Sequence, residues 1–132
     1  MTVTIFDPIT GQILRIVQAP SGIAQNQAQS GEAWMVGKSN DLTQYVSGGL
    51  ITDRPEMPGT LNKTTIVADG ADEMIFSGLP DPCDVAIFGP VNGAAPITGG
   101  TFVLTVDFPG DYRVEFSAFP YLPKEISFVA TA

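Results

Sequence analysis

Short apolar runs, separated by glycine, proline and acidic residues, repeat along the whole 132-residue chain. Within several runs apolar and polar positions alternate, as in Phe102, Leu104 and Val106 against Thr101 and Thr105. A period of two predicts β-strands that bury one face, and few windows carry the helical period. The pattern therefore predicts an all-β protein built from many short strands.

The beginning of the chain predicts a β-hairpin. Residues 2–6 and 12–18 are the expected strands, with Val3 and Ile5 on one face of the first. Between them, Asp7-Pro8-Ile9-Thr10-Gly11 suits a type I turn closed by a glycine bulge, because aspartate favours the turn start and glycine accepts a positive φ.

A polar segment and a second hairpin follow. Residues 19–33 are poor in large apolar groups, and they fit a short helix capped by Ser21 and an irregular connector equally well. Residues 42–52 predict a hairpin around Ser47-Gly48-Gly49, with Ala33-Trp34-Met35-Val36 leading into it.

The proline-rich segment Arg54-Pro55-Glu56-Met57-Pro58-Gly59 predicts an extended linker. We therefore expect an N-terminal hairpin and attachment region at residues 1–59 and an Ig-like antiparallel β-sandwich at residues 60–132. The sandwich strands are expected at residues 63–68, 73–77, 84–88, 96–98, 101–107, 112–119 and 124–131. Strands at this spacing, separated by strong turn signals, are typical of such sandwiches.

One short motif favours an immunoglobulin-like topology. Gly110 precedes Tyr112 by two positions, and Tyr112 opens an alternating strand. In immunoglobulin-like modules a tyrosine at this place bonds back to the preceding loop through its hydroxyl, an arrangement called the tyrosine corner.

Charge and composition narrow the classes of function. Hydrophobic residues make up 44% of the chain, and the formal net charge is −8. The six basic residues are scattered singly, which argues against nucleic-acid binding and against docking on an anionic membrane. The first residues lack a basic segment and a long apolar stretch, so we expect no signal peptide, and no apolar run is long enough for a membrane helix.

The chain contains few of the residue types that enzymes use for catalysis. The chain has no histidine and a single cysteine, Cys83, which removes histidine-assisted nucleophiles and zinc-thiolate sites. We therefore expect no enzyme activity, no catalytic residue, no cofactor and no metal. The loop Asp69-Gly70-Ala71-Asp72-Glu73 fits a polar turn better than a calcium site, and a glycosidase pair built on Asp107 or Asp111 has nothing to favour it.

The N-terminal region is the expected partner-binding surface. Two hairpins joined by a polar connector bury little surface, so their apolar faces need covering by the sandwich or by a neighbouring subunit. We favour the neighbour, bound by strand addition or apolar packing. The predicted docking residues are Ile5, Phe6, Ile13 and Val17, with Trp34 and Tyr45 at a second contact, although both aromatic residues also fit packing inside the region.

In their order along the chain, several segments resemble a family of small tail and tail-fibre-associated structural proteins of tailed bacteriophages. The segments that carry the resemblance are residues 5–13, 44–49, 54–58, 68–73, 77–80, 109–112 and 119–121, among them Asp7-Pro8-Ile9-Thr10-Gly11 and Pro109-Gly110-Asp111-Tyr112. Each alone is turn chemistry between strands. The resemblance implies a virion component and not an enzyme, and it supplies no functional residues.

The expected function is therefore a structural component of a phage virion, tail-associated at a fibre, baseplate or collar, and assembled in the host cytoplasm. Its expected partners are other phage structural proteins and further copies of itself, for which a trimer would fit a fibre, with host-surface glycan or protein as a further contact. The alternatives are a capsid decoration protein, a non-virion assembly factor for tail fibres and, least favoured, a carbohydrate-active enzyme.

Overall fold

The computed structural model describes residues 1–20 and 23–132, and the suggested cap Ser21 lies outside them. Apart from one 3-10 turn, the regular elements in this described part are β-strands, which confirms the all-β class. No helix in it is long and apolar enough to cross a membrane.

The chain forms two compact units, Met1–Pro55 and Glu56–Ala132. The expected boundary after Gly59 thus lies four residues too late. Met57 gives the reason, because its side chain is only 4% exposed in the core of the second unit. Lys124 Nζ also donates to the backbone oxygen of Met57 at 3.4 Å. The end of the expected linker therefore belongs to the sandwich.

The first unit contains a three-stranded antiparallel sheet in the order β2-β1-β3 and a separate hairpin, β4-β5. Its elements are β1 (Thr2–Phe6), β2 (Ile13–Gln18), the 3-10 helix η1 (Ala24–Gln27), β3 (Ala33–Val36), β4 (Gln44–Ser47) and β5 (Leu50–Asp53). The two predicted hairpins are present. The strand β3 pairs with β1 and does not simply lead into the second hairpin.

The turn between β1 and β2 has the predicted chemistry. The Asp7 carboxylate accepts hydrogen bonds from the backbone N–H groups of Ile9 and Thr10, and Gly11 N donates to Asp7 O at 2.8 Å. Gly11 has a φ of 82°, and a Cβ there would lie 2.0 Å from Val46 O. Glycine is therefore required twice, by its backbone angle and by the close approach of β4.

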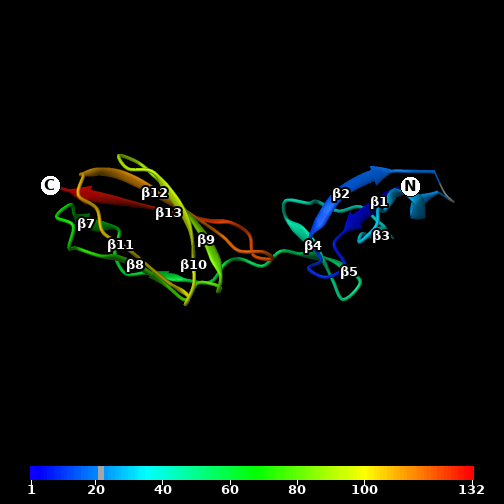
Figure 1. Ribbon diagram of the computed structural model, residues 1–132, viewed down its shortest axis with the longest axis horizontal. Helices are drawn as coiled ribbons and strands as arrows, with labels where there is room; N and C mark the ends of the chain where they lie inside the picture. Colours follow the sequence, from blue (N-terminus) through cyan, green and yellow to red (C-terminus); the bar gives the residue numbers. More distant parts are fainter. Residues whose placement is uncertain (21–22) are drawn as a thin grey trace. The chain divides into compact units, whose positions relative to one another are not determined.

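The second unit consists of a five-stranded sheet in the order β10-β9-β12-β13-β7 and a three-stranded sheet in the order β11-β8-β6. Figure 1 shows the two sheets as separate layers of this unit. Its strands are β6 (Thr60–Leu61), β7 (Thr65–Val67), β8 (Met74–Ser77), β9 (Cys83–Phe88), β10 (Gly93–Ile97), β11 (Thr101–Leu104), β12 (Gly110–Ser117) and β13 (Lys124–Thr131).

This strand order is immunoglobulin-like. The neighbours β9-β12-β13 correspond to the C-F-G sheet of such domains, and β6-β8-β11 correspond to A-B-E. The Tyr112 hydroxyl donates to Phe108 O at 2.7 Å, which is the predicted tyrosine corner. The Ig-like sandwich is thus confirmed, with one departure: β7 pairs in parallel with β13, whereas only antiparallel pairs were expected.

The core of the sandwich lies between its two sheets. Aromatic rings fill much of it: Phe76 stacks on Phe116 at a centroid distance of 4.8 Å, and Tyr112 stacks on Phe128 at 5.0 Å. These rings belong to strands of both layers, so their burial joins the sheets. The alternating residues of β12 supply three of the buried side chains, Tyr112, Val114 and Phe116, as their period of two predicts.

Candidate interaction surfaces

The central strand β1 is buried on both faces. Val3 and Ile5 are 0% exposed and form a small cluster with Ala19, against which Val17 and Ala28 pack. On the opposite face Thr4 is also buried, where its hydroxyl lies 3.0 Å from Gly37 O and 2.7 Å from Ser39 Oγ. The small interior of this unit is therefore built around one strand.

This packing corrects the interpretation of the four apolar docking residues. Ile5 is completely buried and Ile13 is 5% exposed, so neither side chain is accessible to a partner in the folded unit. Phe6 and Val17 are half-buried. The physical reason is that β3 and the connector between β2 and β3 cover the hairpin, whereas the sequence suggested two uncovered hairpins.

The two aromatic residues of the predicted second contact lie on different sheets. Trp34 is on β3, directly opposite Ile5, and remains 40% exposed. Tyr45 is on β4 and half-buried. Val36, two residues from Trp34 and therefore on the same face of β3, is 55% exposed. Of the predicted docking residues, Trp34 is thus the most exposed, and its neighbour Val36 was not anticipated.

The first unit leaves more large apolar side chains exposed than it buries. Among its described residues the large buried ones are Val3, Ile5, Ile13 and Val46. The large exposed ones are Met1, Ile9, Leu14, Ile16, Ile23, Trp34, Val36, Leu42 and Leu50. Two of these, Leu14 and Ile16, lie on β2 next to the predicted Ile13. Strand alternation places both on the face of β2 opposite Val17, but it does not show that this face is left uncovered.

An ion pair fixes the connector that precedes β3. Arg15 on β2 donates from Nη1 and Nη2 to the two carboxylate oxygens of Glu32, at 2.9 and 2.6 Å, and from Nη2 to Gln27 O at 2.8 Å. Glu32 also accepts from Gln29 N at 2.8 Å. Hydrogen bonds from Arg15 and from Gln29 N lower the pKa of Glu32 to about 2. The pair therefore stays ionised at neutral pH and closes the connector against the sheet.

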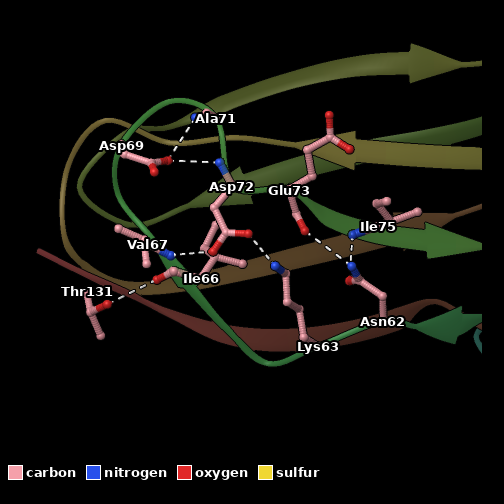
Figure 2. Close-up of polar contacts among 10 residues, drawn as sticks. All are labelled: Asn62, Lys63, Ile66, Val67, Asp69, Ala71, Asp72, Glu73, Ile75 and Thr131. Atoms are coloured by element: carbon pink, nitrogen blue, oxygen red, sulfur yellow. Dashed lines mark hydrogen bonds and ion pairs between the residues drawn. The ribbon is translucent and has the colours of Figure 1, made fainter.

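In the acidic loop of the second unit, Asp69-Gly70-Ala71-Asp72-Glu73, two carboxylates accept hydrogen bonds from nearby backbone N–H groups (Figure 2). Asp69 Oδ1 accepts from the backbone N–H groups of Ala71 and Asp72 at 2.9 and 2.8 Å, and these bonds lower the pKa of Asp69. Asp72 accepts from Val67 N at 2.7 Å and pairs with Lys63, which lowers the pKa of Asp72 in turn. These contacts are those of a polar turn between β7 and β8.

No group of three or more acidic or thiol side chains in the described ranges lies close enough to share one ion. Asn62 reinforces the turn, because its amide donates to Glu73 O and accepts from Ile75 N (Figure 2). The acidic residues here are therefore explained by loop geometry, with Lys63 as their counter-charge.

The outer face of the five-stranded sheet carries an open depression of about 650 Å³. Phe88, Arg113 and Val129 line it together with Thr65 and Ser127. The Arg113 guanidinium lies 4.6 Å from the Phe88 ring centroid, a cation–π arrangement, and 3.6 Å from Glu115. Sequence reasoning missed this surface, because Phe88 and Arg113 lie on strands that are distant in sequence.

Cys83 is poorly suited to nucleophilic chemistry. The residue is 2% exposed at the start of β9, and burial raises the pKa of its thiol. Because the thiolate is the reactive form, a buried thiol with a raised pKa is inert at neutral pH. Its side chain belongs to the sandwich core.

No family model matches this chain, and no curated protein matches it. Among solved structures it is similar to a glycosyl hydrolase family 2 member from Bacteroides cellulosilyticus, with 13% identity and a TM-score of 0.40 over 99% of this chain and 22% of that chain. It is also similar to the D0-D1 domain of intimin, with 18% identity and a TM-score of 0.34 over 96% and 80% of the two chains. This chain thus spans about a fifth of the first protein, and TM-scores this low assign no function.

Proposed function

We propose that this chain is a non-enzymatic structural component of a bacteriophage virion, associated with the tail. Its first unit attaches it to a neighbouring protein, and its Ig-like sandwich is displayed. The observation that supports attachment is the excess of exposed over buried large apolar side chains in the first unit. The virion setting rests on the sequence resemblance described above.

Physical chemistry favours the first unit as the attachment site. A 55-residue unit with so few buried side chains has a small hydrophobic driving force for folding. A partner that covers Leu14, Ile16 and their exposed neighbours removes apolar surface from water. Each Å² of apolar surface buried in this way contributes about 25 cal/mol of stabilisation. Anything that binds the folded form also stabilises it by mass action. Assembly would therefore stabilise this unit as well as fix its position.

The second unit is suited to display. Its core is complete, with buried side chains from both sheets, and the acidic composition of the chain favours solubility of the free protein. The depression around Phe88 and Arg113 offers one aromatic ring, one cation and several hydroxyl groups at the surface. In the proposal this face is available for contact with a host-surface glycan or protein.

Quantitative mass spectrometry of purified particles tests the proposal. A low, fixed copy number is expected for a tail component. Hundreds of copies would indicate a capsid decoration protein, and absence would indicate an assembly factor that leaves before maturation; either result would contradict the tail assignment.

Incorporation of variants tests which unit attaches. Replacing Leu14 and Ile16 by serine should reduce incorporation strongly, because both side chains are exposed on the proposed attachment unit. The matched control replaces Val67 and Val129 by serine. These two residues have similar exposure on the sandwich, and their replacement should leave incorporation unchanged. Equal effects of the two pairs would contradict attachment through the first unit.

A further inference from the structure

Strand β3 ends the sheet of the first unit without the features that normally protect an edge. In the order β2-β1-β3 one side of β3 faces β1, and no described strand pairs with its other side. Its sequence, Ala33-Trp34-Met35-Val36, has no charge and no proline, and its pairing with β1 has no register shift. In soluble proteins, charges, prolines or register shifts on an edge strand usually prevent it from pairing with another chain.

The opposite edge of the same sheet is protected. Strand β2 has Arg15 in its centre and a register shift against β1, and Gly11, just before it, accepts a backbone bond from Val46 N. In the sandwich, the edge strand β10 contains Pro96, and β6 and β7 are only two and three residues long. The edge strand β11 exposes one large apolar side chain, Val103, whereas β3 exposes Trp34 and Val36.

The hydrogen-bond pattern shows which residues of β3 face outward. Gly37 N donates to Thr2 O, so Gly37 directs its backbone groups toward β1. In an antiparallel ladder, bonded and non-bonded pairs alternate. Met35, opposite Thr4, is therefore bonded to β1, whereas Trp34 and Val36 direct their N–H and C=O groups toward the open edge. The same two residues carry the exposed apolar side chains.

We propose that β3 pairs in antiparallel fashion with β3 of a second copy of this chain, about a two-fold axis at Met35. This inference rests on the attachment role proposed above, because it names a partner for that unit. The two sheets would then join into one continuous sheet. Such an interface is self-complementary, since each copy contributes the same strand.

The register about Met35 is supported by both side chains and charges. It places Trp34 of each copy directly opposite Val36 of the other, on the same face, so that both exposed apolar side chains become covered. The outward-facing residues then exchange their free backbone bonds. It also places Glu32 opposite Lys38 of the second copy, which gives one opposite-charge pair at each end of the strand.

Alternative registers lack this match. A pairing about Trp34 would place Glu32 opposite Val36 of the second copy and leave Lys38 without an acid opposite it. Arg15 and Gln29 N already use three of the roughly four acceptor positions of the Glu32 carboxylate, which leaves one, on Oε2, for Lys38 of the second copy. Exposed pairs of this kind fix register more than they add affinity.

Sedimentation equilibrium of the full chain, at rising concentration, is the first test. A monomer–dimer equilibrium is expected. Val36→Lys should raise the dissociation constant about tenfold or more, because it places a charge opposite Trp34 of the second copy. The matched control Val103→Lys changes an exposed valine on another edge strand, β11 of the sandwich, and should leave association unchanged. A monomer at all concentrations, a trimer, or equal effects of the two variants would overturn the proposal.

Amide hydrogen exchange of the unmodified chain provides a test that does not depend on folding of a variant. The N–H groups of Trp34 and Val36 should become protected as concentration rises, whereas Met35 N–H should be protected throughout. Protection of Trp34 and Val36 that does not change with concentration would contradict pairing. A monomeric chain that still enters particles would overturn the pairing alone, and a dimer absent from particles would overturn the proposed function alone.

Discussion

At the scale of single residues, the hydroxyl of Tyr112 joins two parts of the sandwich. Its ring is buried against Phe128, and its hydroxyl reaches back to Phe108 O, in the loop before β12. One side chain thus packs the core and holds the crossing between the two sheets. A partly buried hydrogen bond of this kind contributes about 1 kcal/mol to stability.

Tyr112→Phe removes only the hydroxyl of this residue. We expect the free energy of unfolding of the sandwich to fall by about 1 kcal/mol, since Phe108 O loses its donor. Urea denaturation followed by circular dichroism measures the change. The control Phe108→Ala keeps the accepting carbonyl and removes an exposed side chain, so it should have little effect. An unchanged free energy of unfolding in Tyr112→Phe would show that the hydrogen bond does not stabilise the fold.

Glu32 should make the stability of the first unit depend on acid pH. Its folded pKa of about 2 lies below the ordinary value of 4.5, so the ionised form stabilises the fold. That contribution is complete above pH 4.5 and is lost as pH falls toward 2. Fluorescence of Trp34, the single tryptophan of the chain, should report this loss in urea titrations at several pH values.

Glu32→Gln is the matched variant for that titration, because it keeps the shape of the side chain and removes the charge. Its stability should change less between pH 4.5 and pH 2 than that of the unmodified chain. Identical pH profiles for the two proteins would mean that the contact with Arg15 contributes nothing to folding.

At the scale of elements, the turn before β2 depends on Gly11. Gly11→Ala should destabilise the first unit by more than the roughly 1–2 kcal/mol expected for a positive φ alone, since its Cβ would meet Val46 O. Gly31→Ala separates the two effects, because Gly31 has a φ of 81° and a Cβ added there would meet nothing within 4 Å. Equal losses in Trp34-monitored unfolding would show that the contact with β4 relaxes easily.

Local chemistry made several elements predictable. The turn at Asp7 and Gly11, the Gly48-Gly49 hairpin and the tyrosine corner at Tyr112 each depend on residues close together in sequence. The pairing of β3 with β1 and the parallel pairing of β7 with β13 join distant segments. Alternation in a strand shows which residues share a face, and it does not identify the neighbouring strand.

The same limit explains the errors at the candidate surface. The sequence marked Ile5 and Ile13 as apolar residues in need of cover, which is correct, but it could not show that this unit itself provides the cover. Leu14 and Ile16 were overlooked because exposure depends on what lies over β2. Trp34 was singled out as an aromatic residue outside the expected strand cores, a choice that does not depend on which strand lies beside it.

At the scale of the whole molecule, the chain forms two units, each with its own core, and passes from one to the other at Pro55. We expect two unfolding transitions in urea. Met57→Ala should lower the sandwich transition by about 2–5 kcal/mol, because the side chain is buried there, and should leave the Trp34-monitored transition unchanged. Glu56→Ala, at the neighbouring exposed position, is the control. A single transition shifted as a whole would contradict separate folding.

The central claim is that the first unit attaches this chain to a larger particle and leaves the sandwich displayed. A reconstruction of the assembled particle at side-chain resolution tests it most directly. The account predicts density for this chain at the tail, with Leu14, Ile16 and Trp34 covered by neighbouring protein and the outer face around Arg113 open. Density in which the sandwich is buried and the first unit is free, or in which the chain covers the capsid, would contradict it.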